Sequence, residues 1–213
     1  MFIMETTFSE KLYIGAEWLV RLAYLQVLFF AFMIAGAGVF GLFPSLAAMM
    51  AISRQWLKGN HTSPLHKSFY NYFKQYFLVS NALGLLLSFA SVGIVLYIYW
   101  FLQLGGIWSN IYIYILYLLL FITILVWIYW LPVLVHFDIK AKQIFKYALF
   151  VGMMRPHYTL LLLLLIISLY LLSLLIPGII PLLSISLIVV GWNLIIQRAF
   201  QKISEKQRQI KQV

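Results

Sequence analysis

The chain has 213 residues, of which 64% are hydrophobic and only 9% carry a charge. Soluble domains are about 45–50% apolar and about 25% charged, so this composition excludes an ordinary water-soluble protein, which would expose large apolar patches. In lipid, backbone groups must be satisfied internally, which leaves helices or a closed barrel. Long unbroken apolar runs exclude the alternating pattern of a barrel.

The net charge of +10 lies mainly between the apolar runs. A basic excess can indicate nucleic-acid binding, but this placement is better explained by membrane orientation, so we expect no nucleic-acid partner. The N-terminal flank carries Glu5, Glu10 and Glu17, whereas a secretory signal needs a positive flank. The first apolar run is therefore interpreted as a retained span. The absence of cysteine excludes disulfides and thiolate metal sites.

Proline and glycine divide three uncharged stretches into five predicted membrane spans. Pro44 should end the first helix because it lacks an N–H and clashes with the preceding turn, and Ser45 can cap the next helix. Gly105-Gly106 divides the second stretch, and Pro177-Gly178 divides the third. The spans cover residues 22–43, 77–102, 107–135, 158–176 and 179–197. The first would reach about 33 Å, enough for a hydrocarbon core of about 30 Å.

Two further helices are predicted at the inner membrane surface, at residues 46–57 and 139–154. In the second, an apolar face is formed by Ile144, Phe145, Ala148 and Leu149. Pro64 at a helix start predicts that the second span is preceded by a helical extension carrying Lys67 and Lys74. Amphipathic helices of this kind lie along a membrane interface.

Positive charge predicts the orientation. The loops at residues 44–76 and 136–157 and the tail at residues 198–213 are rich in lysine and arginine, whereas the turns near Gly105 and Pro177 have neither. Because basic loops stay in the cytoplasm, five spans place the C-terminus inside and the N-terminus outside. Trp18 would then mark the outer end of the first span.

An internal repeat is a further hypothesis. Pro44 and Pro132 each end a predicted span, and RQWL (residues 54–57) and KQIF (residues 142–145) each begin ten residues later. Parallel repeats of this type occur in transporters. Chance similarity between hydrophobic segments explains the pattern equally well.

Several segments resemble the YesL-like family of bacterial membrane proteins: VFGLFPSLAA (39–48), RQWL (54–57), LPVLVHFD (131–138) and RPH (155–157). Ser45 and Leu46 depart from the family's usual Ala-Thr. The resemblance covers nearly the whole chain. It implies a bacterial cell-membrane protein of unknown molecular activity, often encoded beside carbohydrate ABC importers and polysaccharide-degrading enzymes.

The pair Glu17 and Arg21 is four residues apart, so both side chains share one helix face at the predicted outer mouth of the first span. An interfacial ion pair is the favoured interpretation, with a polar gate as the alternative. Nearby, GAGVFG (36–41) matches a nucleotide-binding pattern, but no strand precedes it. Close helix packing through small residues explains these glycines better.

Two histidines and an aspartate, His136, Asp138 and His157, lie near the inner ends of spans three and four, next to Arg155. Histidine and carboxylate can bind zinc, but residues two apart cannot share a helical face. A structural hydrogen-bond junction is therefore favoured, and no metal or other cofactor is predicted.

Polar residues inside the spans either join helices by hydrogen bonds, the favoured interpretation, or line a path for a solute. They are Gln26, Ser80, Asn81, Ser88, Ser91, Thr123, Ser184 and Asn193. No ionisable relay lies deep in a span after Arg21, which weakens the case for an ion-coupled carrier. No catalytic arrangement is visible, so we expect no enzyme.

The sequence thus predicts one all-α membrane domain over residues 1–213, a bundle of five transmembrane helices with two cytoplasmic-side surface helices, in the bacterial plasma membrane. The leading hypothesis is an accessory or scaffold component of a carbohydrate uptake system, with the lipid bilayer and carbohydrate ABC importer subunits as partners. The alternative is a transporter or channel for a small neutral solute. An intramembrane enzyme using His136 and His157 is a third, less favoured class.

Overall fold

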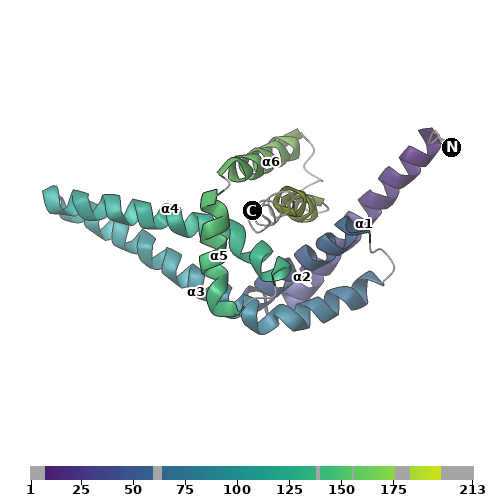
Figure 1. Cartoon of the computed structure of the whole chain (residues 1–213), viewed down its shortest axis with the longest axis horizontal. Coiled ribbons are helices and arrows are strands. Elements are labelled where there is room, and N and C mark those ends of the chain that lie inside the picture. The colour runs from purple at the N-terminus through teal and green to yellow at the C-terminus, as the bar shows by residue number, and fades with distance from the viewer. Residues whose placement is uncertain (1–7, 60–63, 138–139, 155, 176–182, 198–213) are drawn as a thin grey trace, which may run out of the picture.

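The computed structural model describes residues 8–59, 64–137, 140–154, 156–175 and 183–197. Regular structure in these ranges is entirely helical (Figure 1). The elements are α1 (Phe8–Ala35), α2 (Val39–Leu57), α3 (Leu65–Leu104), α4 (Ile107–His136), α5 (Ala141–Met154) and α6 (Pro156–Leu175), followed by a helix at Leu183–Gln197. The all-α prediction is confirmed.

Four helices in the described ranges are long and apolar enough to cross a membrane: Leu12–Ala35, Leu65–Leu104, Ile107–His136 and Pro156–Leu175. The last three of these contain or closely match the spans predicted at residues 77–102, 107–135 and 158–176. The helix at Leu183–Gln197 covers the described part of the span predicted at residues 179–197. The turn predicted at Pro177-Gly178 lies outside the described residues. The chain is therefore a helical protein of membrane type.

Helices α3 and α4 form a long hairpin that extends away from the other helices (Figure 1). The predicted glycine hinge is confirmed, since Gly105 and Gly106 join the two helices with φ values of 64° and 94°, which glycine adopts readily. Beside the turn, Ser109 donates a hydrogen bond to the carbonyl of Phe101. The hairpin is thus closed by both backbone conformation and a side-chain contact.

The predicted boundary between the first two helices is wrong. Helix α1 ends at Ala35, and Pro44 and Ser45 lie buried inside α2. Gly38 N–H donates to Met33 O and Ala37 N–H donates to Ile34 O, while Ala37 has a φ of 59°. These two bonds form a Schellman motif, so the chain reverses at residues 36–38.

Beyond its exposed first turn, helix α2 is enclosed by protein on all sides. Its buried residues are Gly41, Phe43, Pro44, Ser45, Ala47, Ala48, Met49, Met50, Ala51, Ile52, Ser53 and Trp56. A helix lying on a membrane surface would expose one face. The prediction of a one-faced surface helix at residues 46–57 is therefore wrong, because the same apolar residues pack against neighbouring helices.

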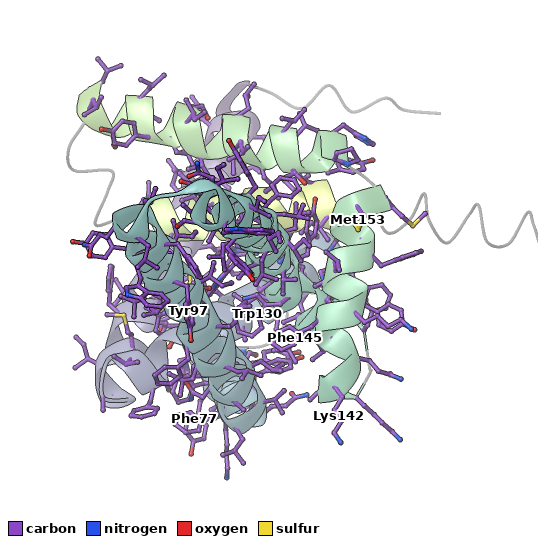
Figure 2. The ribbon with its side chains drawn as sticks, turned by 90° about the vertical axis from the view of Figure 1, so that its left-hand side faces the viewer. Phe77, Tyr97, Trp130, Lys142, Phe145 and Met153 are labelled. Atoms are coloured by element: carbon purple, nitrogen blue, oxygen red, sulfur yellow. The ribbon has the colours of Figure 1, made fainter. Side chains whose placement is uncertain are left out.

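The second predicted surface helix has the expected faces. In α5, Ile144 and Ala148 are buried and Phe145 and Leu149 pack against the core, while Lys142 is exposed. Figure 2 shows Phe145 pointing toward the bundle and Lys142 and Met153 at opposite ends of α5. Its position relative to a membrane stays a prediction.

Helices α1 and α2 form an antiparallel pair. Near the turn, a Cβ on Gly41 would lie only 2.8 Å from Met33 Cα, so glycine permits the two backbones to approach closely. At the other end, the ring centroids of Trp18 and Trp56 are 5.8 Å apart. The interpretation of the 36–41 glycines as packing residues is thereby confirmed for Gly36 and Gly41, whereas Gly38 has nothing within 4 Å of a new Cβ and instead has a positive φ.

The pairing of α1 with α2 also changes the predicted topology. Trp56 is two residues beyond Arg54, whose guanidinium bonds to the last carbonyls of α4, at Val135 and His136. Trp18 therefore lies at the same end of the molecule as His136. The prediction that these two residues mark opposite ends is wrong, because α2 runs back beside α1 instead of leaving it.

Candidate functional site

The buried polar side chains gather around α2. We call five of them the polar network: Gln26, Ser53, Arg54, Asn81 and Asn193. They come from α1, α2, α3 and the helix at Leu183–Gln197, and each makes a hydrogen bond to another helix. Four of the five side chains are buried and Arg54 is partly buried, and together they are the candidate functional site.

Asn81 compensates for the proline in α2. Pro44 has no N–H to bond to Phe40 O, four residues earlier, which leaves that carbonyl without its helical donor. Asn81 Nδ2 donates to Phe40 O at 2.8 Å and to Phe77 O at 2.9 Å. Neighbouring helices commonly satisfy backbone groups freed by proline in membrane helices, and this bond lets α2 continue through Pro44.

Asn193 and Gln26 bind the last described helix to the centre of the molecule. Asn193 Nδ2 donates to Met50 O at 2.8 Å and also to Ser53 Oγ, and all three groups are buried. Gln26 Oε1 accepts the backbone N–H of Ser186 at 2.9 Å. This bond joins α1 to the last described helix through a buried side chain.

Arg54 caps the C-terminal end of α4. Its Nη1 donates to Val135 O at 2.6 Å and its Nη2 donates to His136 O at 3.3 Å. These carbonyls are among the last four of the helix, which have no helical donor, and a cation is favoured at a helix C-terminus. The arginine therefore holds the ends of α2 and α4 together.

The predicted polar gate has the geometry of an ion pair. Arg21 Nη2 lies 2.5 Å from Glu17 Oε1, and both side chains are partly exposed. The ion pair itself is present, whereas its position at a membrane interface stays a prediction. The pair flanks Trp18 and therefore lies at the His136 end of the molecule, not the opposite one.

The two prolines singled out in the sequence differ in their surroundings. Pro44 is the sixth residue of α2, whereas Pro132 lies buried four residues before the end of α4. The carbonyl of Pro132 lies 3.1 Å from His136 Nδ1. The two prolines thus occupy opposite ends of their helices, which removes the repeat unit proposed from the sequence.

The predicted histidine junction is described only in part. His136 is partly buried at the end of α4, and His157 is exposed at the start of α6, with its ring centroid 4.3 Å from that of Tyr158. Asp138 and Arg155 lie outside the described residues. Within the described ranges, no group of three histidine, aspartate or glutamate side chains is placed to hold a metal ion.

The other polar residues in the spans divide into two kinds. Ser88 and Thr123 bond to carbonyls of their own helices, at Gly84 and Leu119. Ser91 accepts a hydrogen bond from Trp127 Nε1 at 2.9 Å and so joins α3 to α4. The prediction that polar residues join helices is confirmed for Gln26, Asn81, Ser91 and Asn193.

Sequence reasoning missed the role of Arg54. A basic residue in a chain with few charges, at the end of an apolar helix, marks a position that needs a partner. Its partners lie 81 and 82 residues away, however. Neither periodicity nor spacing can identify a contact over that distance.

Comparison with known proteins places the chain among bacterial proteins of undetermined activity. It is 36% identical over 179 residues to the uncharacterized protein YteU of Bacillus subtilis (strain 168), covering 81% of this chain and 77% of that protein. It is 34% identical to YesL over 149 residues and 33% identical to YesV over 160 residues, both from the same organism. These matches cover 68% and 73% of this chain, and 68% and 75% of those proteins.

No solved structure matches the chain. The sequence model of DUF624, described as a protein of unknown function, matches residues 22–100. This region contains the α1–α2 turn, Pro44, Arg54 and Asn81. The predicted resemblance to YesL is confirmed, and the chain belongs to the DUF624 family.

Proposed function

We propose that the chain is a multi-pass membrane protein that acts as an accessory or scaffold component of a carbohydrate uptake system. One observation carries the scaffold role: the buried polar side chains that could contact a solute, Asn81, Asn193 and Gln26, are used for bonds between helices. The link to carbohydrate uptake rests on the family resemblance alone.

We further propose the orientation of the scaffold. The end that contains Arg54, Lys58 and His136 faces the cytoplasm, because basic segments are retained there. The α1–α2 pair then enters the membrane and returns to the same side, which puts the start of α1 in the cytoplasm together with the C-terminal tail. Support comes from the contact between Trp18 and Trp56.

Reporter fusions test this orientation. A reporter that is active only in the cytoplasm should be active when fused before Phe8 and after Lys140, and inactive at Gly105. Inactivity before Phe8 with activity after Lys140 would restore the five-span topology with an external N-terminus. Inactivity at both positions would overturn the assignment of the basic end to the cytoplasm.

Purification in mild detergent tests the scaffold role. The chain should be recovered with subunits of a carbohydrate ABC importer, and the purified chain alone should move no labelled oligosaccharide into liposomes. An Arg54→Gln variant, which loses the bonds to the end of α4, should weaken this association, whereas the exposed control Lys142→Gln on α5 should retain it. Absence of any importer subunit in the wild-type preparation would contradict the proposal.

A transporter or channel for a small neutral solute is the second candidate. It is favoured by buried polar atoms around α2 that have no hydrogen-bond partner within the described residues: Gln26 Nε2, Ser45 Oγ, Ser80 Oγ, Asn81 Oδ1 and Asn193 Oδ1. Such atoms could bond to sugar hydroxyl groups. Oligosaccharide flux through the reconstituted chain, abolished by Asn193→Leu, would establish this function in place of the scaffold.

A further inference from the structure

Helix α5 carries a second apolar face that the fold does not use. Ile144, Ala148 and Val151 are buried against the bundle, and a Cβ on Gly152 would lie 3.2 Å from the ring of Tyr129. This inner face fixes the helix in place. On the opposite face, Phe150 is 54% exposed and Met153 is 68% exposed.

Polarity on the outer face changes along the helix axis. Lys140, Lys142 and Gln143 are exposed near the beginning of α5, and Lys146 follows one turn later. Beyond Lys146, the exposed side chains of this face are the aromatic and methionine residues Tyr147, Phe150, Met153 and Met154. The face is therefore cationic at one end and apolar at the other.

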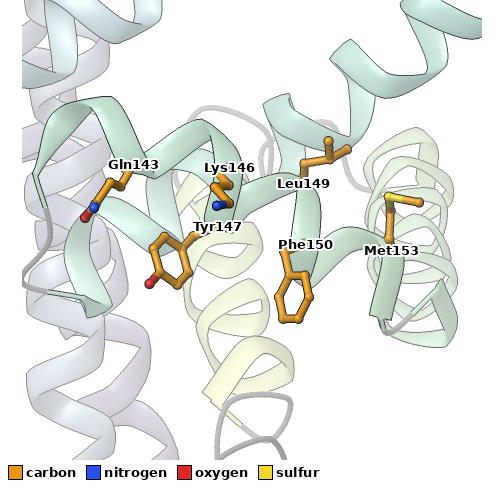
Figure 3. A pocket seen from close by; sticks show the side chains of 6 residues that line it. All are labelled: Gln143, Lys146, Tyr147, Leu149, Phe150 and Met153. Atoms are coloured by element: carbon orange, nitrogen blue, oxygen red, sulfur yellow. The ribbon is translucent and has the colours of Figure 1, made fainter.

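A hollow of about 440 Å³ lies along this face, lined by Gln143, Lys146, Tyr147, Leu149, Phe150 and Met153. In Figure 3, Gln143 and Lys146 lie toward one end of the hollow and Phe150 and Met153 toward the other. An occupant that fits this arrangement has a negatively charged group joined to a long apolar group, with the charge near Lys146.

We propose that the outer face of α5 binds an anionic phospholipid. The phosphate accepts hydrogen bonds from Lys146 Nζ and Gln143 Nε2, with Lys142 one turn away on the same face, and an acyl chain lies over Phe150 and Met153. Lysine residues next to a membrane attract anionic lipid, and methionine adapts to irregular apolar partners. The outer face of α5 thus offers cationic and apolar surface side by side, as a charged headgroup joined to an acyl chain requires.

The position of α5 in the chain also favours a lipid. Its apolar end leads at residue 156 into α6, a helix that is long and apolar enough to cross a membrane. Its cationic end follows the C-terminal end of α4, which is another such helix. Helix α5 thus connects two candidate spans along the chain, and its outer face is the one turned away from the bundle.

Native mass spectrometry of the detergent-solubilised chain tests the site, with phosphatidylglycerol and phosphatidylcholine as probes. The wild type should bind phosphatidylglycerol more tightly. Each lysine near anionic lipid contributes a factor of about five in affinity, so Lys142→Gln with Lys146→Gln should weaken phosphatidylglycerol binding by about 25-fold. Binding of phosphatidylcholine should fall much less, because its choline group already offsets the phosphate charge. The matched pair Lys67→Gln with Lys74→Gln, on α3, should retain the preference.

The apolar end of the hollow has its own test. Phe150→Ser with Met153→Ser should weaken binding of both lipids to a similar extent, because each loses its acyl contacts. An unchanged preference for phosphatidylglycerol in the α5 lysine variant would overturn the proposal, as would equal loss in the α3 control pair. A photo-crosslinker at position 150 that labels another protein in native membranes, and no lipid, would assign the face to a protein partner instead.

Discussion

Helix α2 and the far part of the α3–α4 hairpin are both apolar, but the side chains of α2 face other helices and those of the hairpin face outward. We call residues 85–122 the distal hairpin. Twelve of the 19 residues of α2 are buried within the protein. In the distal hairpin, by contrast, large apolar side chains point outward, and Leu86, Phe89 and Trp108 are 60%, 75% and 77% exposed.

The polar side chains differ in the same way. Ser88 and Ser91, at the base of the distal hairpin, donate to carbonyls four residues earlier in their own helix. Around α2, Asn81 and Asn193 donate to carbonyls of another helix. Lipid offers no hydrogen bonds, so the hydroxyl groups of the hairpin donate within their own helix or, as with Ser109 and Phe101, to the other helix of the hairpin. Around α2, amide side chains instead join helices that are distant in the sequence.

The largest expected effect comes from Gly41→Ala. The added Cβ would meet the backbone of Met33, which cannot move without shifting α1. Overpacking of this kind costs up to about 3 kcal/mol, and we expect that loss in the free energy of unfolding measured in detergent. Gly93→Ala, on α3 where nothing lies within 4 Å of the new Cβ, is the matched control and should be neutral or slightly stabilising. Equal stability of both variants would contradict close packing of α1 on α2.

A double-mutant cycle tests the contact between Asn81 and the proline-freed carbonyl. Asn81→Leu should destabilise the wild type by about 1 kcal/mol, because interhelical hydrogen bonds in membranes contribute about 0.6 to 1.7 kcal/mol. In a Pro44→Ala background, the alanine introduced by the substitution can supply the missing N–H to Phe40 O, so Asn81→Leu should have a smaller effect. Additive effects of the two substitutions would show that Asn81 does not compensate for Pro44.

Ala37→Gly should stabilise the turn between α1 and α2. Ala37 has a φ of 59°, a left-handed conformation that is unfavourable by about 1–2 kcal/mol for residues other than glycine. Part of this gain is offset by the greater freedom of glycine in the unfolded chain. We expect a net gain of about 0.5–1 kcal/mol in thermal or chemical unfolding, and a loss of stability would place the reversal elsewhere.

The smallest effect is expected from Glu17→Gln. The ion pair with Arg21 is partly exposed and lies on one helix, and pairs of this type contribute about 0.3–0.5 kcal/mol. A change in stability much above that range would mean that the pair is enclosed by lipid or by a partner. The variant should also leave any transport activity unchanged. A change in transport at normal protein abundance would instead indicate that the ion pair acts as a gate.

The sequence predicted the elements whose signals are local. The Gly105-Gly106 hinge, the extent of α4 and the buried face of α5 follow from glycine, apolar length and helical periodicity. The break predicted at Pro44 failed because the compensating donor, Asn81, lies 41 residues beyond the carbonyl that it bonds. Prolines in helices cannot be judged without knowing their tertiary neighbours.

For the candidate site, the sequence predicts which residues join helices but not which groups they bond. Gln26, Asn81 and Asn193 were recognised as groups that join helices because they are amides in apolar segments, but their partners could not be named. The link between Arg54 and the end of α4 was missed, since both groups lie at helix ends that the sequence assigned to separate loops.

The enclosure of α2 can be measured directly, because the chain has no cysteine and single ones can be introduced as labelling sites. Ser45 in α2 is fully buried, whereas Ala90 in the distal hairpin is exposed. The two single-cysteine variants to compare are therefore Ser45→Cys and Ala90→Cys. After spin labelling in liposomes, the nitroxide at position 90 should collide frequently with dissolved oxygen, and position 45 should resist labelling or collide rarely. Equal, frequent collisions at both positions would mean that lipid reaches α2, and would contradict the enclosure of this helix by its protein neighbours.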